Sequence, residues 1–272
     1  MKIKIGEFDF SETWDGVFYK KLSHYPSITE WEMQSIFDFI KYEETNGRNC
    51  EIEADEEIIT RLKNYKDIYD SGNRVPAPTV ITECRACPKY KGCMTDFVCH
   101  TASLENGIKI LDCGKLLSAV QARNKNAEEL AKEKRNAAKD PADYFDYVMF
   151  AWGNCQAGDR LVMERKLGRF PDEKDLSTAF TPGIRFFFDY KKLCSHPDAV
   201  FDGVLPVKIK NEVSLKDWVH AIIIPDIYKK DFEGHIPQEL RRKVFYLENN
   251  CKDIWAWSEK VYEFVRKKQN ER

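Results

Sequence analysis

The sequence of 272 residues contains no apolar run that approaches the ~20 residues of a membrane-spanning helix. Its first residues, Met1 to Gly6, lack the apolar core of a secretory signal peptide. We therefore expect a cytoplasmic protein that makes no membrane contact, in a compartment where thiols stay reduced or bind metal. The nine cysteines are an odd number, which does not suggest a disulfide framework.

Several signatures of common enzyme classes are also missing. There is no glycine-x-serine-x-glycine nucleophile elbow, and no glycine-rich phosphate loop that ends in Lys-Ser or Lys-Thr. No paired-carboxylate motif supports a nuclease. The 43 basic and 45 acidic residues leave a net charge of −2. The overall charge therefore does not predict nucleic-acid binding, while a local basic patch stays compatible with it.

The sequence does contain enough apolar material for a large core. Hydrophobic residues make up 43% and aromatic residues 13%, which argues against global disorder. The segment 71–78 holds two prolines and a glycine and is typical of a linker. We expect it to divide a helical N-terminal region, residues 1–75, from a second region, residues 76–272.

Capping residues and apolar patterns set the expected elements. Either Ser27 with Glu30, or Thr29 with Glu32, has capping-box spacing at the start of a first helix that ends near Tyr42. A second helix, a later set of strands and a final helix follow from apolar periodicity. They are expected, in chain order, as a helix from residue 54 or 55, strands at 144–152, 184–190, 205–210, 218–224 and 244–247, and a helix opening at Asp253.

The stretch that organises the chain is 97–118. We expect it to form a short strand that ends in His100 and Thr101, followed by a helix capped by the hydroxyl of Ser103. Gly114 can take the left-handed conformation that ends such a helix. A histidine and a threonine at a strand end, beside the positive pole of a helix, suit a phosphate-bearing ligand.

This stretch also has a wider pattern, made of His100-Thr101, Leu104, Asn106, Ile110-Leu111, Gly114, Leu117 and Ser118. The pattern resembles the first motif of ADP-ribosyltransferase-fold proteins, most of all the DarT-type nucleic-acid ADP-ribosyltransferases and the related RNA 2′-phosphotransferases. The resemblance implies an α+β fold of split antiparallel β-sheets with flanking helices. It also implies an NAD site held by His100, Thr101 and Asn106, and transfer of ADP-ribose to DNA or RNA ahead of protein. The alternative is a plain strand, turn and helix, whose buried histidine donates a hydrogen bond to a backbone carbonyl.

The resemblance extends loosely to the segment after the aromatic run 144–152. In the family such a strand is followed by an arginine and a short apolar run, which Arg160 and residues 161–163 match in placement. The resemblance thus implies that Arg160 steadies the NAD pyrophosphate, which a guanidinium can bind through two hydrogen bonds. The alternative is an ordinary surface salt bridge to Asp159 or Glu164.

The carboxylate that supports ADP-ribosyl transfer in the family is not found at its expected place. That glutamate lies at the start of a late apolar strand, where it hydrogen-bonds the nicotinamide ribose, stabilises an oxocarbenium-like transition state and often activates the acceptor. In this sequence the position falls on His220, and the nearest carboxylates are those of Asp217 and Glu212. We take Asp217 and His220 as the candidates for the role. The alternative for His220 is a strand histidine with its hydrogen bonds satisfied.

Four cysteines lie within sixteen residues in the segment 84–99, at the entry to the second region. They are Cys84, Cys87, Cys93 and Cys99. This spacing suits tetrahedral zinc or an iron–sulfur cluster, and zinc is favoured for a purely structural clip. Cys50 is a remote alternative for the fourth ligand. The other alternative is a set of reduced thiols, in which Cys99 is buried beside His100 as a small hydrophobe.

The cysteines and the missing glutamate together support a second hypothesis of function. In it the chain is a catalytically inactive, transferase-like scaffold that serves as a metal-stabilised binding module. This hypothesis predicts tightly held zinc or iron and no release of nicotinamide from NAD.

Overall fold

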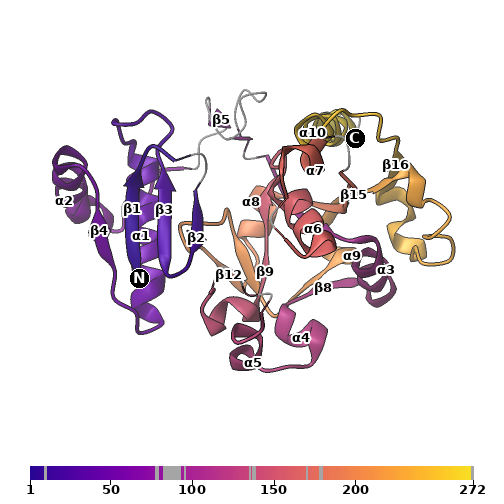
Figure 1. Cartoon of the computed structure of the whole chain (residues 1–272), viewed down its shortest axis with the longest axis horizontal. Coiled ribbons are helices and arrows are strands. Elements are labelled where there is room, and N and C mark those ends of the chain that lie inside the picture. Colours follow the sequence, from indigo (N-terminus) through magenta and orange to yellow (C-terminus); the bar gives the residue numbers. More distant parts are fainter. Residues whose placement is uncertain are drawn as a thin grey trace. The chain divides into compact units, whose positions relative to one another are not determined.

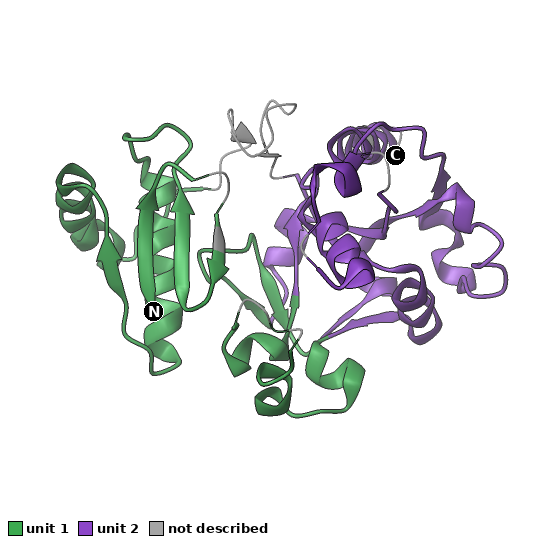
Figure 2. Cartoon of the chain, viewed as in Figure 1, with its two compact units in different colours: residues 1–92, 118–148, 198–211 green, residues 93–117, 149–197, 212–272 purple. Residues whose placement is uncertain are grey.

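The computed structural model describes residues 1–8, 11–76, 80–81, 93–94, 96–134, 136, 139–169, 171–177 and 180–270. The chain is of mixed α and β type, with several sheets and helices (Figure 1). Two compact units, each discontinuous in sequence, make up the chain (Figure 2). Unit 1 holds residues 1–92, 118–148 and 198–211, and unit 2 holds residues 93–117, 149–197 and 212–272. Of the helices within the described ranges, none combines the length and apolar character needed to cross a membrane.

Unit 1 begins with four strands and two helices. The strands are β1 (Lys2–Gly6), β2 (Glu12–Trp14), β3 (Val17–Lys21) and β4 (Glu51–Glu53), in the sheet order β2-β3-β1-β4. β1 is parallel to both β3 and β4, while β2 is antiparallel to β3. The helices are α1 (Glu30–Thr45) and α2 (Glu56–Asp70). Apolar side chains of both layers form one core, which includes Ile3, Phe18, Ile36, Phe39, Ile58 and Leu62.

Local signals explain where the two helices begin. The Thr29 hydroxyl accepts a hydrogen bond from the Glu32 amide, and the Glu32 carboxylate accepts one from the Thr29 amide. The capping box therefore lies at Thr29 and not at Ser27. Asp55 precedes α2, and one stripe of that helix is buried, made of Ile58, Leu62, Tyr65 and Tyr69. Both helices expected in residues 1–75 are confirmed, but the region also holds β1 to β4. Runs of three to five residues carry too little periodic signal to predict them.

Two later segments complete unit 1. They contribute α4 (Ala119–Arg123), α5 (Ala127–Ala131), the 3₁₀ helix η1 (Ala142–Asp146), β9 (Tyr147–Met149), β12 (Ala199–Val200) and β13 (Lys208–Lys210). β12, β13 and β9 form a three-stranded sheet in that order. A further short strand of unit 1 is β5 (Val80–Ile81).

A buried lysine joins the three segments of unit 1. The Lys208 ammonium lies 3.6 Å from the ring centre of Tyr42 and 4.4 Å from those of Tyr144 and Tyr147. Oδ2 of Asp202 lies 3.0 Å from the same nitrogen. Burial lowers the pKa of Lys208, while the nearby carboxylates oppose that shift. Cation–π contacts are stronger when the charge is removed from water, so this cage binds together segments that are distant in sequence.

The cage explains two departures from the sequence expectation. The division of the chain does not fall at a single linker near residue 75, because α1, η1 and β13 share the charged aromatic cluster around Lys208. The aromatic run 144–152 is also not one strand. Its first part forms η1 and β9, and only residues 151–152 continue as β10.

Unit 2 is built on a five-stranded sheet in the order β10-β7-β11-β15-β16. These strands are β10 (Ala151–Trp152), β7 (Phe97–Ala102), β11 (Ile184–Asp189), β15 (Val219–Pro225) and β16 (Val244–Leu247). Neighbouring strands are antiparallel, except that β16 is parallel to β15. The shorter β8 (Lys115–Leu117) and β14 (Glu212–Ser214) pair with each other, and β6 (Cys93–Met94) precedes β7. The strands predicted near residues 184, 218 and 244 are thus confirmed.

The helices of unit 2 define two different faces of this sheet. They are α3 (Leu104–Cys113), α6 (Ala157–Leu167), α7 (Glu173–Ser177), α8 (Tyr190–Cys194), α9 (Leu215–Trp218), the 3₁₀ helices η2 (Asp226–Tyr228) and η3 (Gln238–Lys243), and α10 (Ile254–Asn270). Phe97, Phe187 and Ile223 pack on Trp257 and Val261 of α10, so we call their side of the sheet the α10 face. Because side chains alternate along a strand, the neighbours of these residues point to the opposite side, which we call the His100 face.

Candidate functional site around His100

The strand and helix predicted around His100 are confirmed. β7 ends at Ala102, and the Ser103 hydroxyl accepts a hydrogen bond of 3.4 Å from the Asn106 amide at the start of α3. Gly114 ends the helix with a φ of 70°, a left-handed value that glycine adopts without a steric penalty.

α3 packs on the His100 face of the sheet. A Cβ built at Gly107 of α3 would lie 3.0 Å from Cγ1 of Ile184, which pairs with Ala102 across β11 and β7. The absence of a side chain at Gly107 therefore allows the helix to approach the strands closely. As a result, α3 covers one end of the same face that carries the His100 imidazole.

The His100 imidazole is half-buried and anchored by the backbone. Its Nδ1 lies 3.0 Å from the carbonyl oxygen of Met149, and because a carbonyl can only accept, Nδ1 carries the proton. Burial lowers the pKa of His100, the bond to Met149 opposes the shift, and the charge of Arg165 adds to it. The ring is therefore neutral at pH 7, and Nε2 presents a lone pair that can accept a hydrogen bond.

The Thr101 side chain lies on the opposite face, against two glycines. A Cβ built at Gly158 would lie 2.2 Å from Oγ1 of Thr101, and one built at Gly183 would lie 2.6 Å from its Cγ2. Gly158 belongs to the first turn of α6, so that helix begins on the α10 face directly over Thr101. The side chains of His100 and Thr101 therefore do not converge on one ligand.

A buried ion pair lies next to Thr101. The Arg185 guanidinium donates to Oδ2 of Asp159, with Nε at 3.0 Å, and also donates to the Ser258 hydroxyl of α10. Oδ1 of Asp159 accepts a hydrogen bond of 2.8 Å from the Gly183 amide. Both charged side chains are fully buried. The pair ties α6, β11 and α10 together behind the strand that carries His100.

The sequence alone did not single out this pair, although one signal was present. Arg185 is a charge within the apolar strand segment Ile184–Asp189. A charge in such a place requires a buried partner. The partner, 26 residues earlier in the chain, becomes visible only in the folded structure.

Arg160 does not lie with His100. It follows Asp159 in the first turn of α6, on the α10 face, and its backbone amide donates to the Gln156 carbonyl at 3.0 Å. Asp159, the residue before it, pairs with Arg185. The arginine whose charge reaches His100 is Arg165, in the last turn of the same helix.

Asp217 and His220 are also placed away from His100. Asp217 is exposed on α9, where its carbonyl accepts a hydrogen bond of 2.5 Å from the Lys192 ammonium. His220 lies where the register between β11 and β15 shifts, and its ring centre is 4.8 Å from that of Phe97 on the α10 face. The structure therefore brings neither of them to the imidazole.

The His100 face of β15 is apolar. Phe186 pairs with both His100 and Ile222, and Ile222 pairs with Val244 of β16, so these four residues form one row across the sheet. Val219 pairs with Phe188 on the same side. The β15 side chains of this face are thus Val219, Ile222 and Ile224, all of them buried.

The Asn106 side chain is exposed on α3, one turn after the strand end. The backbone N–H of Asn106 donates to the Ser103 hydroxyl in the helix cap. Asn106 therefore lies beside the helix N-terminus, on the segment that follows His100 directly. Of the predicted NAD-holding set, His100 and Asn106 flank that N-terminus, whereas the Thr101 hydroxyl is enclosed on the other side.

The cysteine cluster is described only in part. Cys84 and Cys87 lie outside the described residues, and Cys93 is described only through the backbone of β6. The Cys99 thiol is buried beneath α10, where burial raises its pKa to about 12. This placement matches the small buried hydrophobe considered above. No three histidine, cysteine, aspartate or glutamate side chains of the described ranges are grouped to hold a metal ion, so the four-cysteine set stays a prediction.

Comparison of the chain with models of protein families, with curated proteins and with solved structures gave no match.

Proposed function

We propose that unit 2 binds NAD against His100 and transfers its ADP-ribose to a macromolecular acceptor, with nucleic acid ahead of protein. The observation that carries the proposal is the neutral His100 imidazole, fixed through Nδ1 to the Met149 carbonyl and followed at once by the capped start of α3. An accepting Nε2 suits a ribose hydroxyl, and a helix N-terminus on the same side suits a phosphate. The preference for nucleic acid follows from the resemblance of the 97–118 pattern.

The sheet also gives support to the proposal. β10 pairs with β7 only at Val98 and Cys99, so this neighbour ends one residue before His100. Beyond that point the chain runs through Phe150 to Met149, the last residue of β9, whose carbonyl anchors the imidazole. The charge of Arg165 contributes to the lowered pKa of His100, so positive charge is felt at the site proposed for NAD.

A second candidate is favoured by the apolar face of β15. Val219, Ile222 and Ile224 offer no carboxylate to stabilise an oxocarbenium-like transition state beside His100. Without such a group the same scaffold would bind NAD and leave it intact, as a binding module. Any metal held by the cysteines of 84–99 would then serve stability alone.

The two candidates are separated by one turnover experiment. The protein is incubated with NAD labelled in its adenylate phosphate, together with single-stranded DNA, RNA or a protein mixture, and both nicotinamide release and label transfer are measured. Transfer that His100→Ala abolishes and His24→Ala, a substitution in unit 1, leaves intact supports the transferase. Binding of NAD without nicotinamide release supports the binding module, and absence of binding contradicts both.

The metal expectation has its own test. Protein purified without oxygen is examined by elemental analysis and by its absorption spectrum, which separates zinc from an iron–sulfur cluster. We expect one metal site per chain that is lost when Cys84 and Cys87 are replaced by serine. Absence of both metals would remove the cysteine set from the account.

A further inference from the structure

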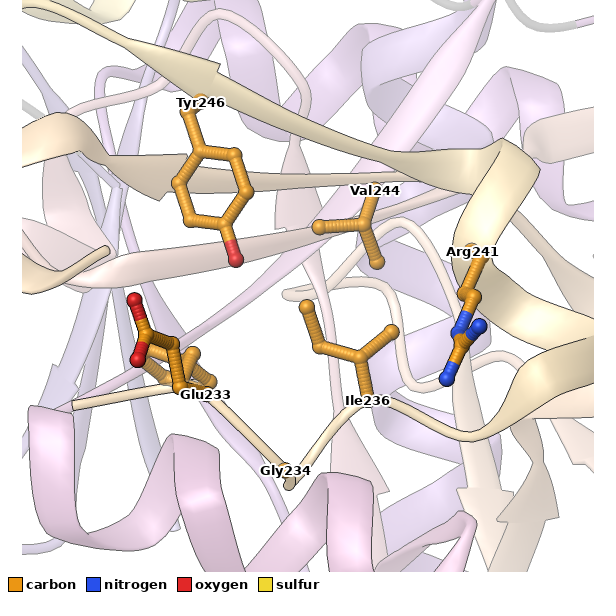
Figure 3. Close-up of a pocket in the computed structure, with 7 residues that line it drawn as sticks. Glu233, Gly234, Ile236, Arg241, Val244 and Tyr246 are labelled. Atoms are coloured by element: carbon orange, nitrogen blue, oxygen red, sulfur yellow. The ribbon is translucent and has the colours of Figure 1, made fainter. Parts of the chain in front are cut away.

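A pocket lies at the β16 edge of the unit 2 sheet (Figure 3). Its volume is about 320 Å³, and it is lined by Phe232, Glu233, Gly234, Ile236, Arg241, Val244 and Tyr246. Val244 and Tyr246 belong to β16, which is separated from the His100 strand by β11 and β15. The pocket is therefore a second site, distinct from the one proposed for NAD, and nothing in the NAD argument uses it.

Two lining residues carry opposite charges at separate places. Glu233 and Arg241 lie apart in the pocket, and the side chains of Ile236 and Val244 lie between them (Figure 3). Within the described part of the chain, neither the Glu233 carboxylate nor the Arg241 guanidinium has a hydrogen-bond or ion-pair partner. The pocket thus presents one negative end, one positive end and an apolar centre.

The negative end has further chemistry of its own. The Tyr246 hydroxyl points toward the Glu233 side of the pocket (Figure 3). Burial and the Glu233 charge both raise the pKa of Tyr246, so the phenol stays protonated at neutral pH and its oxygen can accept a hydrogen bond. The Lys229 ammonium, 5.7 Å from the Tyr246 ring centre, partly offsets the negative charge at this end.

We propose that this pocket binds a short apolar peptide with free termini. The terminal ammonium would lie at Glu233 and Tyr246, the terminal carboxylate at Arg241, and the apolar side chains on Ile236 and Val244. Charge-assisted hydrogen bonds at both ends fix its direction, while apolar contact in the centre supplies burial.

Other small ligands fit this charge pattern less well. A single amino acid carries both charges on one carbon, whereas the side chains of Ile236 and Val244 lie between the two charged residues of the pocket (Figure 3). A polyamine would be repelled by Arg241, and a dicarboxylate would be repelled by Glu233. A nucleoside monophosphate places a phosphate at Arg241 but supplies no cation for Glu233.

The proposal is tested by calorimetry of the whole chain with the dipeptide leucyl-leucine and two capped forms of it. One form is acetylated at its amine and the other is amidated at its carboxylate, so each lacks one charge. We expect the free dipeptide to bind, and each capped form to bind about tenfold more weakly or worse, because each loses one charge-assisted hydrogen bond.

Matched variants identify the two ends. Arg241→Gln is expected to bind the free dipeptide and its amide alike, while Arg242→Gln, the neighbouring substitution outside the pocket, keeps the wild-type preference. Glu233→Gln is expected to bind the free and the acetylated dipeptide alike, with Glu239→Gln as its control. Lys229→Gln is expected to tighten binding of the free dipeptide, because a competing positive charge is removed.

Several results would overturn the proposal. The first is that the wild type does not bind the dipeptide at about 10 mM. The second is that the capped and free forms bind equally well. The third is that Arg241→Gln and Glu233→Gln leave the affinity unchanged. Binding of adenosine monophosphate in place of the dipeptide, lost in Arg241→Gln, would also overturn it. The titrations contain no NAD, so their outcome is independent of the function proposed for His100.

Discussion

The side chains of His100 and Thr101, consecutive in β7, lie on opposite faces of the unit 2 sheet. His100 is held by the Met149 carbonyl on one side, and Thr101 is enclosed by Gly158 and Gly183 on the other. A ligand that contacts the imidazole therefore does not contact the threonine hydroxyl. In this chain, Thr101 serves the close approach of α6, and of the two side chains only that of His100 lies on the face where we propose that NAD binds.

The pH dependence of stability should carry a signature of His100. Its pKa is lowered from 6.5 by burial, so the folded state resists a proton that the unfolded state accepts. The free energy of unfolding is therefore at its full value above pH ~6.5, the pKa of the unfolded state. It decreases as the pH falls from there through the folded-state pKa, by at most about 1.4 kcal/mol per pH unit. Urea unfolding between pH 5 and 8 measures it, and His100→Asn should flatten the acid limb whereas His24→Asn should not. An unchanged acid limb in His100→Asn would refute this assignment.

The buried pair of Asp159 and Arg185 should behave as one coupled unit. Asp159→Asn leaves the Arg185 charge buried without its counter-ion, and Arg185→Met leaves the Asp159 charge likewise, so each should cost about 3–5 kcal/mol of unfolding free energy. The double variant should cost clearly less than the sum. A double-mutant cycle by urea unfolding checks this, and additive costs would show that the two charges do not stabilise each other.

Gly203 should be far less replaceable than Gly16, although both have positive φ values, 72° and 76°. A Cβ at Gly203 would lie 1.8 Å from the Ser35 carbonyl oxygen and 2.7 Å from the Phe39 amide nitrogen, both in the α1 backbone, whereas a Cβ at Gly16 meets nothing within 4 Å. Gly16→Ala should therefore lower the free energy of unfolding only by the strain of a left-handed alanine, about 1 kcal/mol. Gly203→Ala should cost at least about 2 kcal/mol more, because the clash displaces its segment. Equal denaturation midpoints would mean that this segment does not rest on α1.

Elements with local signals were predictable from the sequence. The Thr29–Glu32 capping box, the cap of α3 at Ser103 and the left-handed Gly114 each depend on residues within a few positions of one another. The apolar runs of β11 and β15 were also placed correctly, because buried strands need continuous apolar side chains. The half-buried β16 was placed by its short apolar run.

Features that depend on distant partners were not predictable. Tyr144 and Tyr147 belong to an aromatic run typical of a strand, yet part of that run forms a 3₁₀ turn against Lys208, some sixty residues later in the chain. Strand alternation puts the side chains of His100 and Thr101 on opposite faces, although the resemblance assigned both to one NAD site. The glycines that enclose Thr101 come from distant parts of the chain. His220 and Asp217 were placed by aligning an apolar run, and the register shift in β15 moves His220 to the α10 face.

The most direct test of the account is NAD affinity, measured by calorimetry for the wild type, His100→Ala and Thr101→Val. Valine keeps the shape of threonine between Gly158 and Gly183, so Thr101→Val should bind NAD within about threefold of the wild type. His100→Ala should bind about tenfold more weakly or worse, because it loses the accepting Nε2. Equal affinity of His100→Ala and the wild type, or a loss in folded Thr101→Val as large as that in His100→Ala, would contradict an NAD site on the His100 face.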